Sequence, residues 1–272
     1  MSAQKLTKIA ALQIGELSQS LSRLDYYMRI CVSEGVSALV LGEYTMQPFF
    51  KSLIKMPKGE ISALADKRKW DLSELCQKHG ISLITSLIMP KNGALYKGVA
   101  SFKADGAFKF SPQNVLISYP HWDEEKFFAN STQKLSLQTF KFNDLKVGVI
   151  NAYEAHFDEC WRFLAKKGVH LVIALSANTF ASNARWEALL KAKALSYGVS
   201  VLRVARVGEY CDDDKSRWEF YGDSMLISPS AEVLWRLGSK EELGIASIDK
   251  NEILKQRSIW NFRAQARQRG WL

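Results

Sequence analysis

The sequence predicts one α/β domain in which a mixed β-sheet system is covered by helices. Two observations support this prediction: apolar, strand-like runs alternate with amphipathic helical stretches, and glycines stand where several of these stretches end. Buried strands that alternate with helices, together with hairpins, are typical of mixed sheets that carry helices on their faces. No linker, low-complexity tract or short repeat interrupts the pattern, so we expect a single domain over residues 1–272.

The first part of the chain contains three apolar runs that are typical of buried strands: 8–15, 36–44 and 81–90. A helical pattern follows the first run and is closed by Gly35. A second helical pattern, around 66–80, ends at Gly80, because glycine readily adopts the left-handed conformation that terminates helices. Residues 92–110 are expected to form hairpin strands that turn at the Asp-Gly pair 105–106.

Strand-like runs continue in the second part of the chain, at 146–151, 169–177 and 199–208. We expect helices at 157–167 and 182–197, the second with Ser182 or Asn183 as its N-cap. The last predicted strands form a pair, within 221–238 and 243–250.

The composition is typical of a folded globular protein without membrane spans. Apolar residues make up 47% of the chain and eight residues are tryptophan, so the chain can bury a sizeable core. No apolar run approaches the roughly 18 residues of a membrane span, and the N-terminus lacks the apolar segment and cleavage site of a secretory signal. The four cysteines are widely spaced and form no CxxC pair. We therefore expect a reduced, cytoplasmic protein with no membrane partner.

The formal net charge of +9 raises the question of nucleic-acid binding. The basic residues are spread along the chain, and the densest local group, RAQARQRGWL at the C-terminus, holds three arginines. No nucleic-acid module with aromatic residues interleaved on a basic strand is present. A solvated basic face is therefore favoured over a nucleic-acid site.

One segment, 146–168, has the strand, sharp turn and helix on which many α/β hydrolytic enzymes mount a nucleophile. The residue at the turn is Ala152, which has no nucleophilic atom. Cys160 lies about 12 Å further along a helix and is most easily explained as a small buried hydrophobic residue. His156 and Cys160 are four residues apart, but a metal site would need further ligands at matching spacing, so no metal is expected.

Two acidic segments are candidates for a functional carboxylate. Glu43 directly follows an apolar strand, at the carboxyl edge of the predicted sheet where α/β proteins gather their ligand sites. The aromatic MQPFF that follows favours a lined pocket, although an ordinary loop glutamate is the alternative. Glu125, in YPHWDEEKFF, could supply a second carboxylate, although exposure is the default for such a charge.

In their order and spacing, these segments resemble the nitrilase superfamily, the carbon–nitrogen hydrolases. The resemblance covers residues 7–265 and is nearest to the branch of N-carbamoylputrescine amidohydrolase and β-ureidopropionase-like enzymes. It rests on KIAALQIG, LVLGEYTMQPFF, DEEKFF, KVGVINAYEAHFDE, FYGDSMLISPSAEVL and RSIWNFRAQARQ.

In that family a glutamate acts as general base, a cysteine attacks a nitrile, amide or carbamoyl carbon, and a lysine with a backbone N–H stabilises the oxyanion. The resemblance places the base on Glu43 and a second, supporting glutamate on Glu125. It places the lysine on Asn114, between the ADG and EKFF anchors, and the cysteine on Ala152. No cofactor is implied.

Both substitutions remove chemistry that the family needs, because alanine has no nucleophile and asparagine has no positive charge. The resemblance therefore implies a natural site that has lost its catalytic cysteine and lysine. The residues expected around its pocket are Trp122, Tyr153, Glu154 and Arg206.

The resemblance also implies a four-layer α–β–β–α sandwich with two stacked mixed sheets. It implies a homodimer that pairs through the helices 157–167 and 182–197. Three functions stay open, in this order: an inactive protein that binds a small amide, carbamoyl or carboxylate metabolite, or a protein partner; an active carbon–nitrogen hydrolase with a non-standard site; and a nucleic-acid-associated basic protein.

Overall fold

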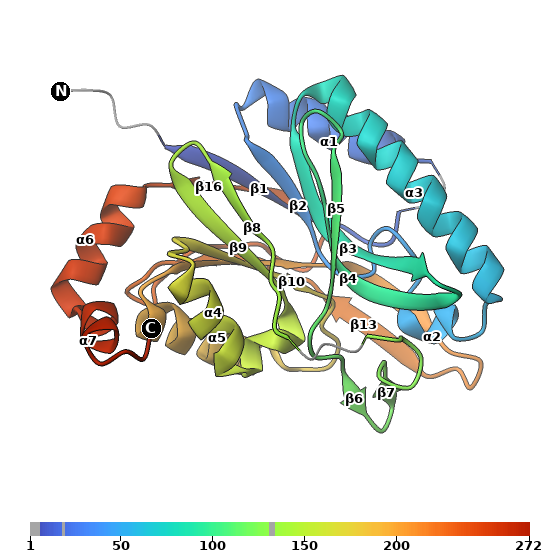
Figure 1. Ribbon diagram of the computed structural model, residues 1–272. Helices are drawn as coiled ribbons and strands as arrows, with labels where there is room; N and C mark the ends of the chain where they lie inside the picture. Colours follow the sequence, from blue (N-terminus) through green and yellow to red (C-terminus); the bar gives the residue numbers. More distant parts are fainter. Residues whose placement is uncertain (1–5, 18–19, 131–133) are drawn as a thin grey trace.

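Two six-stranded β-sheets lie face to face, and helices cover both outer faces (Figure 1). The computed structural model describes residues 6–17, 20–130 and 134–272. The first sheet has the strand order β16 (Glu242–Ile248), β1 (Thr7–Gln13), β2 (Ala38–Leu41), β3 (Ser82–Lys91), β4 (Ala94–Phe102) and β5 (Phe108–Pro112). The second has the order β15 (Val233–Arg236), β14 (Met225–Ile227), β11 (Ser200–Ala205), β10 (Leu171–Ser176), β9 (Leu145–Asn151) and β8 (Thr139–Phe142).

Each sheet carries one pair of long helices. The first sheet is covered by α1 (Ser22–Ser33) and α3 (Lys58–His79), and the second by α4 (Asp158–Lys166) and α5 (Asn183–Tyr197). The remaining elements are short or lie at the C-terminus: α2 (Phe50–Leu53), β6 (Ser118–Tyr119), β7 (Trp122–Asp123), the 3₁₀ helix η1 (Ala152–His156), β12 (Val207–Cys211), β13 (Arg217–Tyr221), α6 (Lys250–Trp260) and α7 (Phe262–Gln268). No helix within the described ranges is long and apolar enough to cross a membrane.

Burial on both faces explains the continuous apolar strands. In β1, Ile9 and Ala11 pack between the two sheets, whereas Ala10 and Leu12 pack under the helices of the first sheet. Because side chains alternate along a strand, such a strand needs apolar residues at every position. The predicted four-layer α–β–β–α architecture with two mixed sheets is confirmed.

The parallel strands bring two loops together. In the first sheet β1, β2 and β3 run parallel, and in the second β9, β10 and β11 do. The chain leaves β2 through Gly42 and Glu43, and the Glu43 N–H donates to the carbonyl of Ser176 at the end of β10. The carboxyl ends of the two sheets therefore meet, and the turn after β9 lies at the same edge.

Two stretches differ from the sequence-based expectation. Residues 199–208 form two strands in place of one, because β11 continues the second sheet while β12 pairs with β13 in a separate ribbon. The stretches 221–238 and 243–250 do not pair with each other. Strands β14 and β15 form a hairpin in the second sheet, and β16 crosses to pair antiparallel with β1 in the first.

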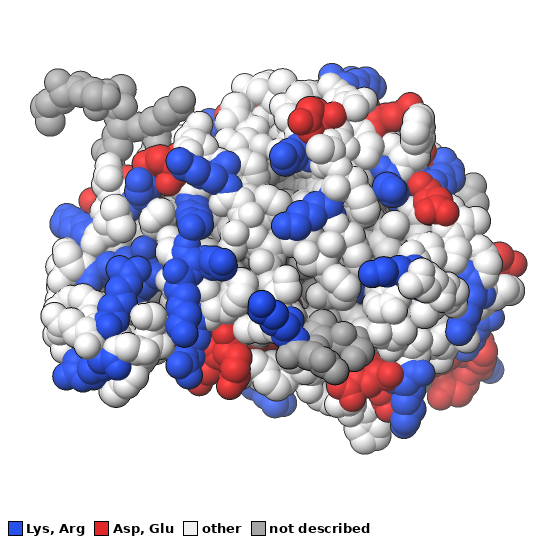
Figure 2. Space-filling model, viewed as in Figure 1, with Lys and Arg blue, Asp and Glu red and all other residues white. Residues whose placement is uncertain are grey.

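Two arginines, the half-buried Arg257 and the buried Arg263, hold the C-terminal helices against the second sheet's helices. Arg257 donates to the carbonyls of Gly198 and Val169, and Arg263 donates to those of Val169 and Ala165. These carbonyls lie at the ends of α4 and α5, where a positive charge is favoured by the helix dipole. On the face shown in Figure 2, basic side chains are scattered and are densest toward the end where α6 and α7 lie.

Gly42 links the packing of the sheets to the loop that carries Glu43. A Cβ atom added to Gly42 would lie 2.7 Å from the carbonyl oxygen of Ser176 and 2.9 Å from the amide nitrogen of Arg206. Both contacts are backbone atoms, which cannot move aside cheaply. We expect Gly42→Ala to lower the free energy of unfolding by about 1–3 kcal/mol, measured by urea denaturation.

The matched control is Gly59→Ala in α3, where nothing lies within 4 Å of the added Cβ. That variant should be as stable as the wild type or slightly more stable, since alanine favours a helix over glycine. Equal stability of the two variants would contradict the close sheet contact at Gly42.

Candidate functional site

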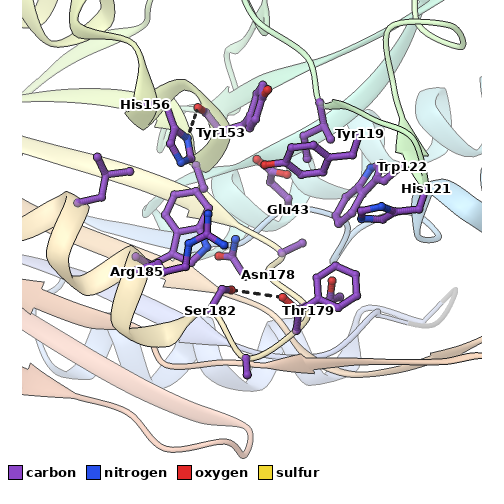
Figure 3. A pocket seen from close by; sticks show the side chains of 17 residues that line it. Glu43, Tyr119, His121, Trp122, Tyr153, His156, Asn178, Thr179, Ser182 and Arg185 are labelled. Carbon is purple, nitrogen blue, oxygen red and sulfur yellow. Dashed lines mark hydrogen bonds between the residues drawn. The ribbon is translucent and has the colours of Figure 1, made fainter.

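A cavity of about 340 Å³ opens where the carboxyl ends of the two sheets meet. Its lining comes from the loops after β2, β5, β9 and β10 and from α5. Figure 3 shows Glu43 in the centre of these side chains. Much of the wall is aromatic, formed by Tyr119, His121, Trp122, Tyr153, Phe180 and Trp186. A concave site with an aromatic wall and a few polar groups is typical of small-molecule binding.

A buried cation lies against Glu43. The Nζ atom of Lys97 is 3.0 Å from Glu43 Oε2, and 2.8 Å and 3.0 Å from the two carboxylate oxygens of Glu124. The side chains of Lys97 and Glu124 are fully buried, and Glu43 is only 3% exposed. The ammonium also lies 4.8 Å from the ring centre of Tyr44, a favourable cation–π contact. Two buried carboxylates thus share one lysine.

Lys97 lies on strand β4, and its side chain points to the same face of the strand as those of Leu95 and Val99. Leu95 packs beside the pocket, and Val99 packs between the two sheets. The side chain of Asn130 fixes the backbone at this point, accepting from the Lys97 N–H at 3.1 Å and donating to its carbonyl at 2.7 Å. The lysine is therefore held by the sheet and by a neighbouring loop.

The Glu124 carboxylate is saturated with hydrogen bonds. It accepts from the Tyr44 hydroxyl, from the Trp122 indole N–H at 3.1 Å and from Lys97. One oxygen of Glu43 is different: Oε1 is buried and accepts no side-chain hydrogen bond among the described residues, while the backbone N–H of Ala152 faces the carboxylate. A buried acceptor without a side-chain partner, on a residue that lines a cavity, is accessible to a ligand.

Burial raises the pKa of Glu43 to about 7, because desolvation disfavours the charged form and the charge of Glu124 adds to this effect. The charge and hydrogen bond of Lys97 act in the opposite direction. For Lys97 itself, burial alone would lower the pKa, but Glu124 and Glu43 outweigh it and raise the pKa above its ordinary value. The charge of Lys97 thus favours the ionised form of Glu43, whereas burial and Glu124 disfavour it.

The turn after β9 presents a methyl group to the cavity. Ala152 is the first residue of η1, and it lines the cavity together with Glu43. Glu154 holds the turn closed: its Oε2 accepts from the Asn151 N–H at 2.9 Å. Its Oε1 accepts from the backbone and side-chain N–H groups of Asn114, both at 2.7 Å. Burial raises the pKa of Glu154, and these hydrogen bonds oppose the rise.

Comparison with known proteins identifies the family. The carbon-nitrogen hydrolase family model matches residues 8–257. The chain belongs to the carbon-nitrogen hydrolase family. It is 27% identical to the ω-amidase NIT2 of Danio rerio, over 85% of this chain and 83% of that protein.

Solved structures of the family share the fold. A carbon-nitrogen hydrolase from Helicobacter pylori G27 superposes with a TM-score of 0.84 at 21% identity, covering 95% of this chain and 94% of that one. A cysteine-to-alanine mutant of the amidase from Nesterenkonia sp. AN1, in complex with butyramide, superposes with a TM-score of 0.76 at 20% identity. That alignment covers 98% of this chain and 97% of the amidase.

Most residues that the sequence singled out lie at or next to the cavity. Glu43, Ala152, Tyr153 and Trp122 line it. Asn114 and Glu154 bind each other behind the turn and do not line it.

Arg206 also lies outside the cavity lining. It is buried against the ring of Phe220 and donates to the carbonyl of Tyr44 at 2.6 Å. Arg206 thus supports the loop that carries Glu43 and does not face a ligand.

The second glutamate of the site is Glu124, whereas the sequence pointed to Glu125. The Glu125 side chain is exposed, while its neighbour Glu124 is buried against Lys97. The motif DEEKFF contains both, and the motif alone cannot decide which one turns inward. The Glu124 N–H bonds the Ile117 carbonyl at 2.7 Å, which fixes the inward direction of residue 124.

Lys97 was not predicted, because the resemblance places the lysine of the site at residue 114. A signal was present in ALYKGVASF: a lysine shares one face of a buried strand with Leu95 and Val99. A lysine at such a position requires buried anionic partners.

Cys160 does not contribute to the site. It is 1% exposed within the core under α4, and burial raises the pKa of its thiol to about 12. His156 ends η1 and lines the cavity, while Cys160 belongs to α4, so the two do not share one helix. The expectation that Cys160 packs in the core is confirmed.

The raised pKa of Glu43 predicts a pH dependence of stability. Between about pH 4.5 and 7 the folded protein holds a proton on Glu43 more readily than the unfolded chain does. The free energy of unfolding of the wild type, minus that of Glu43→Gln, should therefore fall as pH rises through this window. One proton limits the slope to about 1.4 kcal/mol per pH unit.

Chemical denaturation at several pH values measures this difference. The control variant is Glu125→Gln, which removes an exposed carboxylate from the neighbouring loop. If the wild-type free energy of unfolding, relative to that of Glu43→Gln, instead rises with pH across this window, burial does not raise the pKa of Glu43.

Proposed function

We propose that this protein binds a small amide or carbamoyl metabolite in the Glu43 cavity without hydrolysing it. The observation that carries the proposal is that Ala152, which has no nucleophilic atom, lines the cavity beside the buried carboxylate of Glu43. The curated relative named ω-amidase and the butyramide-bound neighbour support a small amide as the ligand class.

The two side chains that could stabilise an oxyanion are already engaged in other hydrogen bonds. An ammonium has three N–H donors, and Lys97 directs its three toward Glu43 Oε2 and the two oxygens of Glu124. The Asn114 side-chain amide is committed to Glu154 and to the Ser136 carbonyl. Neither group has a free donor for a developing oxyanion, and such donors supply much of the rate in acyl transfer.

Turnover measurements test the proposal. Purified protein given ω-amides, N-carbamoyl amines and aryl nitriles should release ammonia at least about 10⁴-fold more slowly than an active ω-amidase, because the nucleophile is absent. Turnover above buffer that disappears in Glu43→Gln would instead support a hydrolase with a non-standard site, in which Glu43 activates water directly.

A gain-of-reactivity variant checks that Ala152 occupies the nucleophile position. In a Cys211→Ser background, which removes the exposed thiol, Ala152→Cys should form a covalent adduct with acrylamide. The adduct should be found at residue 152 by peptide mass spectrometry. The Cys211→Ser parent, whose three remaining cysteines are buried, should stay unmodified under the same conditions. An unreactive cysteine at 152 would place the reactive position elsewhere.

We also propose that the protein is a homodimer that pairs through α4 and α5. These helices cover the second sheet, and a groove lined by Arg162, Leu189 and Tyr197 runs along their outer side. Sedimentation velocity should give a species of twice the 30.8 kDa chain mass over a range of concentrations. A 30.8 kDa species at every concentration would exclude this assembly.

A further inference from the structure

The loop after β10 presents a side-chain amide to the Glu43 cavity. Asn178 lines the cavity, and in Figure 3 its side chain points inward from the loop. The Oδ1 atom of Asn178 accepts a hydrogen bond from Arg203 Nη2 at 2.8 Å. Because a guanidinium has only donors, the amide atom that faces it must be the oxygen, and Nδ2 is turned away from Arg203. The buried arginine therefore fixes the orientation of the amide.

Arg203 is itself held by several contacts. It is fully buried on β11, on the same face of the second sheet as Val201, which packs under α4 and α5. Its Nη1 atom donates to the carbonyl and to the carboxylate of Asp223, at 2.9 Å and 3.0 Å. Its Nη2 atom also donates to the Tyr221 hydroxyl at 3.3 Å. A guanidinium with a carboxylate partner on one side of its planar fork has little freedom to turn.

The nitrogen end of the Asn178 amide has no partner in the protein. Its two N–H groups donate to no residue in the part of the chain that the structure describes. The side chain is half-buried and lines the cavity. A donor whose hydrogen-bonding capacity is unused, at the wall of a cavity, is available to an acceptor atom of a ligand.

We propose that Asn178 donates to the carbonyl oxygen of the bound ligand, and that Arg203 is the positioning residue that keeps the N–H groups of Asn178 turned to the cavity. This inference rests on the proposed binding function and adds a donor to the side chains that hold the ligand. Arg203 does not line the cavity, so it acts through Asn178. Without Arg203 the amide could rotate by half a turn and present its oxygen, which cannot donate to a carbonyl.

Exchange of the donor for an acceptor tests the role of Asn178. Asn178→Asp keeps the shape of the side chain and its contact with Arg203, but an oxygen that only accepts replaces the N–H groups. The dissociation constant of butyramide, measured by ligand-observed NMR, should rise at least about 10-fold, because a hydrogen bond is lost and two acceptors then face each other. An unchanged constant would overturn the donor role.

The matched control is Asn183→Ala. Asn183 donates to the same Asp223 carboxylate at 3.5 Å, but it does not line the cavity. Its loss should change the dissociation constant of butyramide by less than about 2-fold, since it disturbs the network without removing a group that faces the ligand.

A double-mutant cycle tests the role of Arg203. Arg203→Lys keeps a buried cation beside Asp223 but loses the planar fork that reaches Asp223 and Asn178 together. It should weaken butyramide binding at least about 5-fold in the wild type and less than about 2-fold in Asn178→Ala, because the arginine acts through that amide. Equal weakening in both backgrounds would show a merely structural role and overturn the assignment. If Arg203→Lys does not fold, Arg203→Met combined with Asp223→Asn replaces it, since that pair removes both buried charges together.

A covalent probe separates failure of this inference from failure of the binding function. If butyramide does not bind the wild type, the proposed binding function fails. In the Cys211→Ser background, Ala152→Cys treated with acrylamide holds a propanamide group in the cavity without any need for affinity. The side-chain amide signals of Asn178, assigned by their absence from Asn178→Asp, should then shift in a nitrogen-edited NMR spectrum, while those of Asn183 should not. Unshifted Asn178 signals would overturn the donor role whatever the affinity for butyramide.

Discussion

The structure of the site depends on one buried interaction, a lysine ammonium held between two carboxylates. Glu43 and Glu124 are buried, and each would carry a large desolvation cost as an unpaired ion. Lys97 offsets that cost by contacting three of their four oxygens. The Tyr44 and Trp122 donors complete the hydrogen bonds of Glu124, so the position of every member depends on the others.

This cluster also connects the fold to the cavity. Glu43 leaves the first sheet after β2, Lys97 belongs to β4 of the same sheet, and Ala152 leaves the second sheet after β9. Close packing at Gly42 brings the Glu43 loop against the backbone of β10 and β11. The cavity therefore lies at the contact between two sheets, and its base is held by strands while its mouth is formed by loops and α5. Rigid support of this kind keeps Glu43 Oε1 in place when no ligand is bound.

Much of the fold could be predicted from the sequence, and part of the site could not. Strands with both faces buried have continuous apolar runs, and helices ended at glycines such as Gly80, which has a positive φ of 63°. These local signals located most elements, as well as Glu43 and Ala152. The partner of each strand is not a local property, so the crossing of β16 to the first sheet was not foreseen. The inward turn of Glu124 depends on a hydrogen bond to Ile117, which is likewise invisible in the motif.

Lys97 lies close in the sheet to Asn114, the position at which the resemblance places the lysine of the family. Gly98 pairs with Pro112 across β4 and β5, and the Gln113 N–H donates to the Lys97 carbonyl. Position 97 therefore lies opposite position 113, one residue before Asn114, and Lys97 contacts both Glu43 and Glu124. Lys97 balances the charge of the two carboxylates, and it is itself enclosed by Glu43 and Glu124. The cluster thus meets a requirement of stability, and under the proposed binding function it need not meet a requirement of catalysis.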